Sequence, residues 1–138
     1  MHAIKPVLLA EDDEVDQQAM KRCFKELHIK NDLVVTNNGE EALTYLRNGG
    51  KRDKPCLILL DLKMPKMDGI EFLREVKRDA KLKAIPVVVL TTSGLERDKT
   101  ESFDLGVAGY MLKPPEHLKL VDIVRTIDLY WTLSEWPA

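Results

Sequence analysis

Apolar residues follow two alternating patterns along the chain: short unbroken runs, and recurrences at every third or fourth position. A short apolar run bounded by polar residues predicts a buried strand, and the three- and four-residue spacing predicts an amphipathic helix. The runs predict strands over residues 7–10, 32–36, 56–60, 87–90 and 108–112. The spacing predicts helices over residues 14–27, 39–48, 69–79, 96–105 and 115–133.

This alternation predicts the fold class. Strand and helix repeat five times with short connections, which indicates parallel strands joined by right-handed crossovers in a three-layer α/β domain. The run at 57–60 contains four consecutive apolar residues, as expected for a strand buried on both faces of a parallel sheet. We see no internal repeat or low-complexity segment, and we expect one domain over residues 1–138 with no output domain.

Two of the predicted helices carry finer expectations. The helix over 115–133 is expected to begin at Pro115, because the fixed backbone angle of proline suits a first helical turn. In the helix over 14–27, the residues expected to face the core are Val15, Ala19, Cys23, Phe24 and Leu27.

Composition and charge exclude several classes. Apolar residues make up 44% of the chain and charged residues 32%, as in soluble globular proteins. The formal net charge of -2 gives no support for a nucleic-acid partner. No apolar run approaches the roughly 20 residues that cross a bilayer, and the first residues lack the apolar core of a signal peptide. We therefore expect a cytoplasmic protein without a membrane partner, with Cys23 and Cys56 as reduced thiols.

Polar side chains follow four of the five predicted strands. The first strand leads into Glu11 and Asp12, the third into Asp61, the fourth into Thr91 and the fifth into Lys113. Parallel strands share one carboxyl edge, where open α/β sheets hold their ligands. Taken alone, Asp61 is equally well explained as a turn residue that caps the next helix. Together, the five residues are expected to converge on one site.

The side chains at this edge favour phosphoryl chemistry. Three clustered carboxylates repel one another unless a cation lies among them, and oxygen ligands without His or Cys favour Mg²⁺. A lysine and a hydroxyl nearby can hold the oxygens of a phosphoryl group. The reaction that fits is phosphoryl transfer to Asp61 as the nucleophile. The sequence has no GxxxxGK[ST] loop for a nucleotide, so the donor must come from outside.

The same residues resemble the receiver domain of two-component response regulators, a flavodoxin-like family that includes the bacterial chemotaxis receiver. The motifs are the acidic pair Glu11-Asp12, the segment 61–69 with DLKMP and a later DG, Thr91, and Gly109-Tyr110 ahead of Lys113-Pro114. The resemblance covers nearly the whole chain. It implies a five-stranded parallel sheet in the order 2-1-3-4-5.

The resemblance also implies roles at the strand ends. Asp61 would be the phosphoacceptor, and Asp12 and Asp61 would bind Mg²⁺ directly. Glu11 would assist through water, and the backbone carbonyl of Lys63 would be a further ligand. Lys113 would contact the phosphoryl group. The donor would be a histidine kinase or a phosphotransfer protein, and the chain would be a signalling protein that catalyses only its own phosphorylation and dephosphorylation.

The family likewise implies a switch and an unusual peptide bond. Thr91 would move its hydroxyl to the phosphoryl group and Tyr110 would turn inward, and this pair would change the surface that partners bind. Without the resemblance, each would be an ordinary strand residue. The bond between Lys113 and Pro114 is expected to be cis.

Three positions leave questions open. Asp13 follows the acidic pair and is expected to cap the next helix, although a register in which Asp13 belongs to the pair remains an alternative. Thr92 stands where the family usually has a small residue, and Lys63 places a cation near the path of an attacking water. Either could change the lifetime of the phosphoryl group.

The C-terminal helix carries more apolar residues than one core face needs. One stripe comprises Leu120, Val124, Ile127 and Trp131. Ile123, Tyr130 and Leu133 widen this stripe, and Trp136 follows. Exposed large side chains at helical spacing are typical of a contact surface, although the tryptophans could simply close the edge of the core. This end resembles response regulators that partner cyanobacterial phytochrome kinases, and it implies a homodimer through the helix.

The sequence therefore predicts a single-domain response regulator that accepts a phosphoryl group on Asp61. One alternative is a receiver-like dimeric adaptor that acts without phosphorylation. Another is a small Mg²⁺-dependent phosphohydrolase, which is disfavoured because Lys63 stands where that class has a second aspartate.

Overall fold

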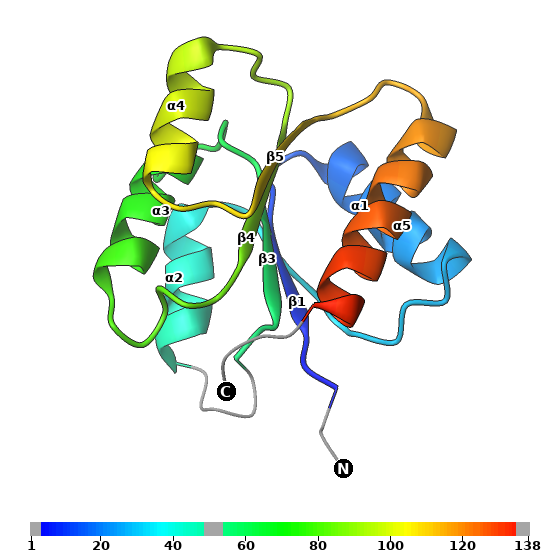
Figure 1. Ribbon diagram of the computed structural model, residues 1–138, viewed down its shortest axis with the longest axis horizontal. Helices are drawn as coiled ribbons and strands as arrows, with labels where there is room; N and C mark the ends of the chain where they lie inside the picture. Colours follow the sequence, from blue (N-terminus) through cyan, green and yellow to red (C-terminus); the bar gives the residue numbers. More distant parts are fainter. Residues whose placement is uncertain (1–3, 49–53, 135–138) are drawn as a thin grey trace.

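Figure 1 shows the chain as a computed structural model that describes residues 4–48 and 54–134. Within this part, strands and helices alternate as the sequence predicts. The strands are β1 Val7–Ala10, β2 Leu33–Thr36, β3 Leu57–Leu60, β4 Val87–Thr91 and β5 Gly109–Leu112. The helices are α1 Glu14–Glu26, α2 Gly39–Asn48, α3 Gly69–Arg78, α4 Glu96–Asp104 and α5 His117–Leu133.

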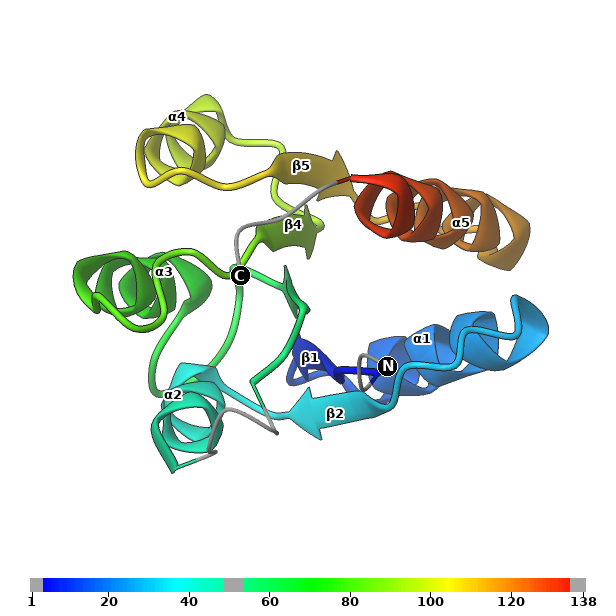
Figure 2. The same ribbon diagram turned by 60° about the horizontal axis from the view of Figure 1, so that its bottom comes forward.

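The strands form one sheet in which all neighbours are parallel, in the order β2-β1-β3-β4-β5. Helices α2, α3 and α4 cover one face of the sheet and α1 and α5 the other (Figures 1 and 2). The three-layer flavodoxin-like fold and the predicted strand order are confirmed. None of the described helices combines the length and the apolar character needed to span a membrane.

The central strands are apolar throughout, apart from Thr91 at the end of β4, because both faces of the sheet are covered. In β3, Ile58 and Leu60 pack into the core under α2 and α3, whereas Leu57 and Leu59 pack into the core under α1 and α5. The strands β1, β3 and β4 are buried throughout. The polar residues that follow these strands are therefore carried to one edge of the sheet.

Two aspartates fix where helices begin at this edge. The Asp13 carboxylate accepts hydrogen bonds from the backbone N–H groups of Val15, at 2.8 Å, and Asp16, at 3.2 Å, and so caps α1. Asp68 caps α3 by accepting from the N–H of Glu71 at 2.9 Å. Asp13 therefore caps the helix as expected, which supports Glu11 and Asp12 as the acidic pair.

The structure corrects the predicted core face of α1. Val15 is exposed, with 76% of its surface accessible, while Gln17 and Met20 are buried. The polar Gln17 is buried because its side-chain amide donates to the carbonyl oxygen of Glu11 at 2.6 Å and to the side-chain oxygen of Asn37 at 2.8 Å. Both partners lie outside the helix, six and 20 residues from Gln17, so apolar spacing alone does not identify Gln17 as an inward residue.

Two expectations about the segment from β5 to α5 are also wrong. The helix begins at His117, because Glu116 has extended backbone angles and leaves Pro115 in the preceding loop. The predicted stripe does face the core: Val124, Ile127 and Trp131 are buried and Leu120 packs against them, with Val121 as a further buried member. No peptide bond in the described residues is cis, so Lys113-Pro114 is trans, the form that a tertiary amide prefers by about 0.5–1 kcal/mol. Trp136 lies outside the described residues.

Helix α4 is the least embedded of the described helices. It buries only Ser102, and its Phe103 side chain is exposed. Polar contacts hold it in place: an ion pair joins Glu101 to Arg74 of α3, and Asp98 accepts a hydrogen bond from the Ser93 hydroxyl at 2.5 Å.

The loop between β3 and α3 packs against its own start. The N–H of Gly69 donates to the carbonyl oxygen of Leu62 at 2.9 Å. A Cβ atom on Gly69 would lie 2.6 Å from the Leu62 Cα and 2.7 Å from the Asp61 carbonyl oxygen. Since both contacts are with backbone, only glycine permits this approach.

We expect Gly69→Ala to lower the free energy of unfolding by about 1–3 kcal/mol, because the methyl group overlaps backbone atoms that cannot move independently. Urea unfolding measures this change. Gly94→Ala is the matched control, because a Cβ atom on Gly94 meets nothing within 4 Å. Equal unfolding midpoints for the two variants would show that the loop relaxes around the methyl group.

Candidate functional site

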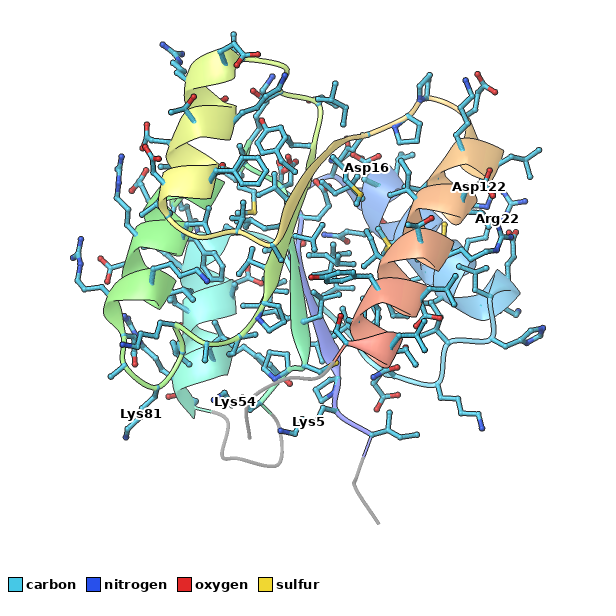
Figure 3. The ribbon with its side chains drawn as sticks, viewed as in Figure 1. Lys5, Asp16, Arg22, Lys54, Lys81 and Asp122 are labelled. Atoms are coloured by element: carbon cyan, nitrogen blue, oxygen red, sulfur yellow. The ribbon has the colours of Figure 1, made fainter. Side chains whose placement is uncertain are left out.

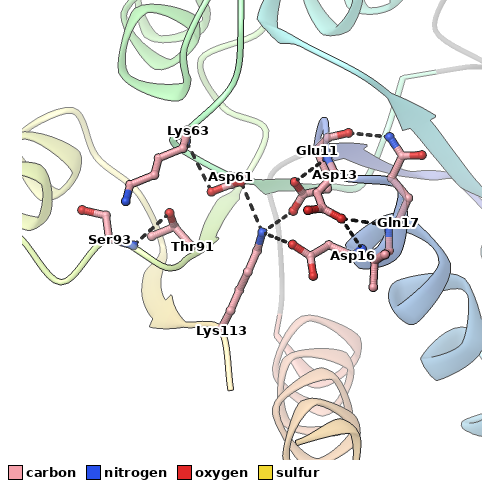
Figure 4. A network of polar contacts seen from close by, with 10 residues as sticks. Glu11, Asp13, Asp16, Gln17, Asp61, Lys63, Thr91, Ser93 and Lys113 are labelled. Carbon is pink, nitrogen blue, oxygen red and sulfur yellow. Dashed lines mark hydrogen bonds and ion pairs between the residues drawn. The ribbon is translucent and has the colours of Figure 1, made fainter. Parts of the chain in front are cut away.

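Four strand ends meet at the carboxyl edge of the sheet, around the ammonium group of Lys113. This group donates to Asp61 Oδ2 at 3.2 Å, to Asp16 Oδ2 at 2.8 Å and to Glu11 Oε1. Figure 4 shows the ammonium between Asp61 on one side and Glu11 and Asp16 on the other. The edge is acidic overall, whereas Lys5, Lys54 and Lys81 lie at the opposite end of the sheet (Figure 3).

Two of the three carboxylates in contact with Lys113 are buried, and the third, Asp16, is partly exposed. Glu11 is 2% exposed and Asp61 5%. Burial raises the pKa of Glu11 to about 7, against the opposing hydrogen bond from Lys113, and the negative charge of Asp61 raises it further. Burial alone would lower the pKa of Lys113, but its hydrogen bonds to Asp16 and Glu11 and the charge of Asp61 outweigh that effect and raise the pKa. The ammonium is therefore charged, and it compensates the acidic cluster only in part.

Three carboxylates form a set that could surround a metal ion. One oxygen from each of Glu11, Asp12 and Asp61 lies within 4.8 Å of the others. Asp12 is exposed and the other two residues are buried, so the set opens to solvent on one side. Lys63 approaches from the loop, and its backbone N–H donates to Asp61 Oδ1 at 3.4 Å. This donor set consists of oxygen atoms alone and suits a hard divalent cation.

Thr91 and Tyr110 lie next to this cluster and are connected through Ser93. Thr91 is fully buried, and its hydroxyl oxygen accepts from the N–H of Ser93 at 3.3 Å. The Tyr110 hydroxyl donates to the carbonyl oxygen of Ser93 at 2.8 Å. Partial burial raises the pKa of Tyr110, so the phenol stays protonated as a donor. Thr91 of β4 and Tyr110 of β5, both predicted from the sequence, thus hydrogen-bond to the backbone of the same residue, Ser93.

Two residues of this network are absent from the sequence-based prediction, Asp16 and Ser93. Asp16 lies in the first turn of α1, and this helix begins at the site. The sequence did offer a signal for it: an acidic residue in the first turn of the helix that follows the acids after β1. Ser93 lies two residues beyond Thr91, and the sequence gives no sign that both of its backbone polar groups are used.

An open groove leads from solvent to the acidic set. Its walls include Asp12, Lys63 and Pro65 from the strand-end loops and Leu95 and Arg97 from the start of α4. Thr92 and Lys63 are both exposed. The groove therefore reaches the acidic set at its exposed member, Asp12.

The raised pKa of Glu11 gives the protein a pH dependence. Between the ordinary value of 4.5 and about 7, the folded chain keeps a proton on Glu11 that the unfolded chain has lost. Through this group, the free energy of unfolding falls as pH rises across that window. We expect Glu11→Gln to remove this fall, so that the variant gains stability relative to the wild type as pH rises.

Urea unfolding in EDTA at several pH values measures this difference. Glu14→Gln, at an exposed position in the first turn of α1, is the control and should follow the wild-type pH profile. A constant difference between Glu11→Gln and the wild type from pH 4.5 to 7 would contradict the prediction.

Known proteins resemble this chain in both sequence and fold. Response regulator Rcp1 of Synechocystis sp. is 38% identical over 130 residues, which cover 92% of this chain and 88% of Rcp1. A probable methanogenesis regulatory protein of Methanothrix harundinacea, FilR2, is 39% identical over 140 residues, which cover 96% of this chain and 88% of FilR2.

Solved structures agree. The phosphorylated cyanobacterial phytochrome response regulator RcpA superposes with a TM-score of 0.90 at 38% identity, covering 99% of this chain and 100% of RcpA. The Mn²⁺-bound form of Rcp1 superposes with a TM-score of 0.87 at 38% identity, covering 97% of this chain and 99% of that one. The family model of the response regulator receiver domain matches residues 7–125. From its strand order, its acidic carboxyl edge and these relatives, the chain belongs to the response regulator receiver family of two-component systems.

Proposed function

We propose that this receiver domain accepts a phosphoryl group on Asp61 from a histidine kinase or a phosphotransfer protein, in a reaction that requires Mg²⁺. One observation carries the proposal. Asp61 is a buried carboxylate that is 3.2 Å from the Lys113 ammonium and also belongs to the acidic set that could surround an ion. Asp61 would thus be the nucleophile, a hydrogen-bond partner of the Lys113 ammonium and a metal ligand at once.

In the proposed reaction, a carboxylate oxygen of Asp61 attacks the phosphorus atom of a phosphohistidine. The new O–P bond forms as the P–N bond breaks, and the electron pair of that bond leaves with the imidazole. Lys113 stabilises the negative charge on the phosphoryl oxygens because its ammonium is already held next to Asp61. The chain acts only on itself, as acceptor and later as the site of hydrolysis.

The metal would be held by Glu11, Asp12 and Asp61, with the backbone carbonyl of Lys63 as a further ligand. When bound, Mg²⁺ neutralises the charge on the phosphoryl oxygens and aligns donor and acceptor. The Mn²⁺-bound structure of Rcp1 supports a divalent ion in a relative. The oxygen-only donors favour Mg²⁺ over softer metals here.

Phosphorylation would then change the surface of the chain. A phosphoryl oxygen on Asp61 competes for the Thr91 hydroxyl, which now accepts from the Ser93 N–H. Moving that hydroxyl loosens the segment to which Tyr110 is bonded, and Ser93 also holds α4 through Asp98. We therefore propose that Thr91 and Tyr110 couple the acidic site to the α4–β5–α5 surface and so to partner choice.

A second proposal concerns assembly. At its C-terminal end, α5 exposes Leu129 at 54% and Leu133 at 78%, four residues apart on one side of the helix. This apolar end supports a homodimer, and a phosphorylation-independent dimeric adaptor is the alternative function that the same observation favours. The proposed location is the cytoplasm, since Cys23 and Cys56 are both unpaired and free thiols are the rule there.

Incubation with acetyl phosphate and Mg²⁺ tests the acceptor. We expect the wild type to gain the mass of one phosphoryl group and Asp61→Asn to gain none, because the amide is a far poorer nucleophile. Intact-mass spectrometry measures the gain, and EDTA should abolish it. Asp68→Asn, which alters the cap of α3 in the same loop, should still gain the phosphoryl group.

The outcomes separate the two functions. A gain in the wild type that persists in Asp61→Asn would place the acceptor elsewhere. No gain in the wild type under conditions that load other receivers would favour the adaptor, with Lys63 and Thr92 as the next residues to change.

Sizing chromatography tests the dimer. We expect the double variant Leu129→Lys, Leu133→Lys to elute as a monomer where the wild type elutes as a dimer, because two ammonium groups would face each other across the contact. Leu118→Lys is the control. Leu118 is 77% exposed but lies in the first turn of the same helix, so this variant should stay dimeric. Dimers in both variants would exclude this end of α5 as the contact.

A further inference from the structure

Lys113 has one carboxylate partner that stands outside the acidic set. Its ammonium contacts Glu11, Asp61 and Asp16, and an ammonium has three N–H donors for these three partners. Glu11 and Asp61 also belong to the set that could surround an ion, whereas Asp16 does not. The role of Asp16 follows from this difference.

Hydrogen-bond donors and a metal ion would compete for the carboxylate oxygens of Glu11 and Asp61. All four of their carboxylate oxygens have hydrogen-bond donors: Glu11 receives Lys113 and the N–H of Asp13, and Asp61 receives Lys113 and the N–H of Lys63. An entering divalent cation must take oxygens from these donors. It also repels the Lys113 ammonium, because both are positively charged. Metal entry and retention of Lys113 therefore oppose each other at these two carboxylates.

Asp16 offers the ammonium an anchor that the metal does not claim. Its Oδ2 accepts from Lys113 at 2.8 Å, shorter than the 3.2 Å contact to Asp61. The backbone of Asp16 is held in the first turn of α1, because its N–H donates to the Asp13 cap at 3.2 Å. Figure 4 shows Asp16 and Asp61 reaching the ammonium from different directions.

The lysine chain also has room to shift. A small cavity lies beside it, lined by Lys113, by the carboxylates of the site and by the apolar side chains of Leu9, Met20, Leu60 and Leu120. Only 13% of the Lys113 side chain is exposed, whereas 40% of the Asp16 side chain is, so a shift towards Asp16 moves the ammonium from the buried carboxylates to a half-buried one at the rim of the site. A small displacement towards Asp16 needs no repacking of the sheet.

We propose that Asp16 is a positioning residue that retains the Lys113 ammonium while Glu11 and Asp61 turn to the metal. It lowers the cost of metal entry and keeps the cation within reach of the phosphoryl group. The inference rests on the proposed metal and phosphoryl site, but it concerns metal affinity and can be measured without phosphorylation.

Isothermal calorimetry with Mg²⁺ alone tests this. We expect Asp16→Asn to bind Mg²⁺ about fivefold more weakly than the wild type, because the ammonium then has only Glu11 and Asp61 to hold. Asp16→Glu, which keeps the carboxylate, should recover most of the affinity. Glu14→Gln removes one exposed negative charge from the same helical turn and measures the general electrostatic effect, which should be smaller.

A double-mutant cycle identifies the route. In a Lys113→Met background, we expect Asp16→Asn to change Mg²⁺ affinity no more than Glu14→Gln does, since Asp16 acts through the ammonium. An equal loss with and without Lys113, an unchanged affinity in Asp16→Asn, or no Mg²⁺ binding by the wild type would each overturn the proposal. Failure of acetyl phosphate to modify Asp61 would instead count against the proposed function and leave the calorimetric result standing.

Discussion

The attraction between one ammonium group and the buried carboxylates around it is the interaction on which this site depends. A parallel sheet carries every strand end to the same edge, so Glu11 and Asp61 are brought together whether or not their charges favour it. In a medium of low dielectric, that repulsion is strong and is screened little by salt. Lys113, from the far end of the chain, offsets it. Burial raises the pKa of Glu11 even though Lys113 lies beside it, and the charge of Asp61 raises it further. A divalent cation among these carboxylates would offset both effects.

The rest of the fold supports this arrangement with backbone groups rather than with further side-chain cations. Helices α1 and α3 both begin at the acidic edge, capped by Asp13 and Asp68. The partial positive charge at a helix N-terminus favours nearby anions, by roughly 0.3–1 kcal/mol for each at an exposed position. Gly69 lets the loop after β3 fold back onto Asp61 and Leu62. These devices fix the positions of the carboxylates without neutralising them, so the site stays receptive to a divalent ion.

The sequence was sufficient to predict the features that depend on local pattern. The apolar strands could be recognised because burial on both faces leaves unbroken apolar runs, with Thr91 at the end of β4 as the one polar residue in β1, β3 and β4, and the strand-end residues follow from that assignment. It was insufficient wherever a distant partner decides the outcome. Gln17 is buried because it bonds to Glu11 and Asn37. Asp16 joins the site only because Lys113, 97 positions away, reaches it. Apolar periodicity carries no information about such polar contacts.

The shallow embedding of α4 has a consequence for the energy of any signal that passes through the molecule. A helix that buries only a serine gains little from the hydrophobic effect, and its polar contacts to Arg74 and Ser93 can be exchanged for water at modest cost. Its alternative positions therefore lie close together in free energy. A partner that prefers one of them needs only a small difference in affinity to change the populations substantially, since about 1.4 kcal/mol already gives a tenfold shift. Under the proposed function, the buried sheet would fix the chemistry and the shallowly embedded helix would make the response sensitive.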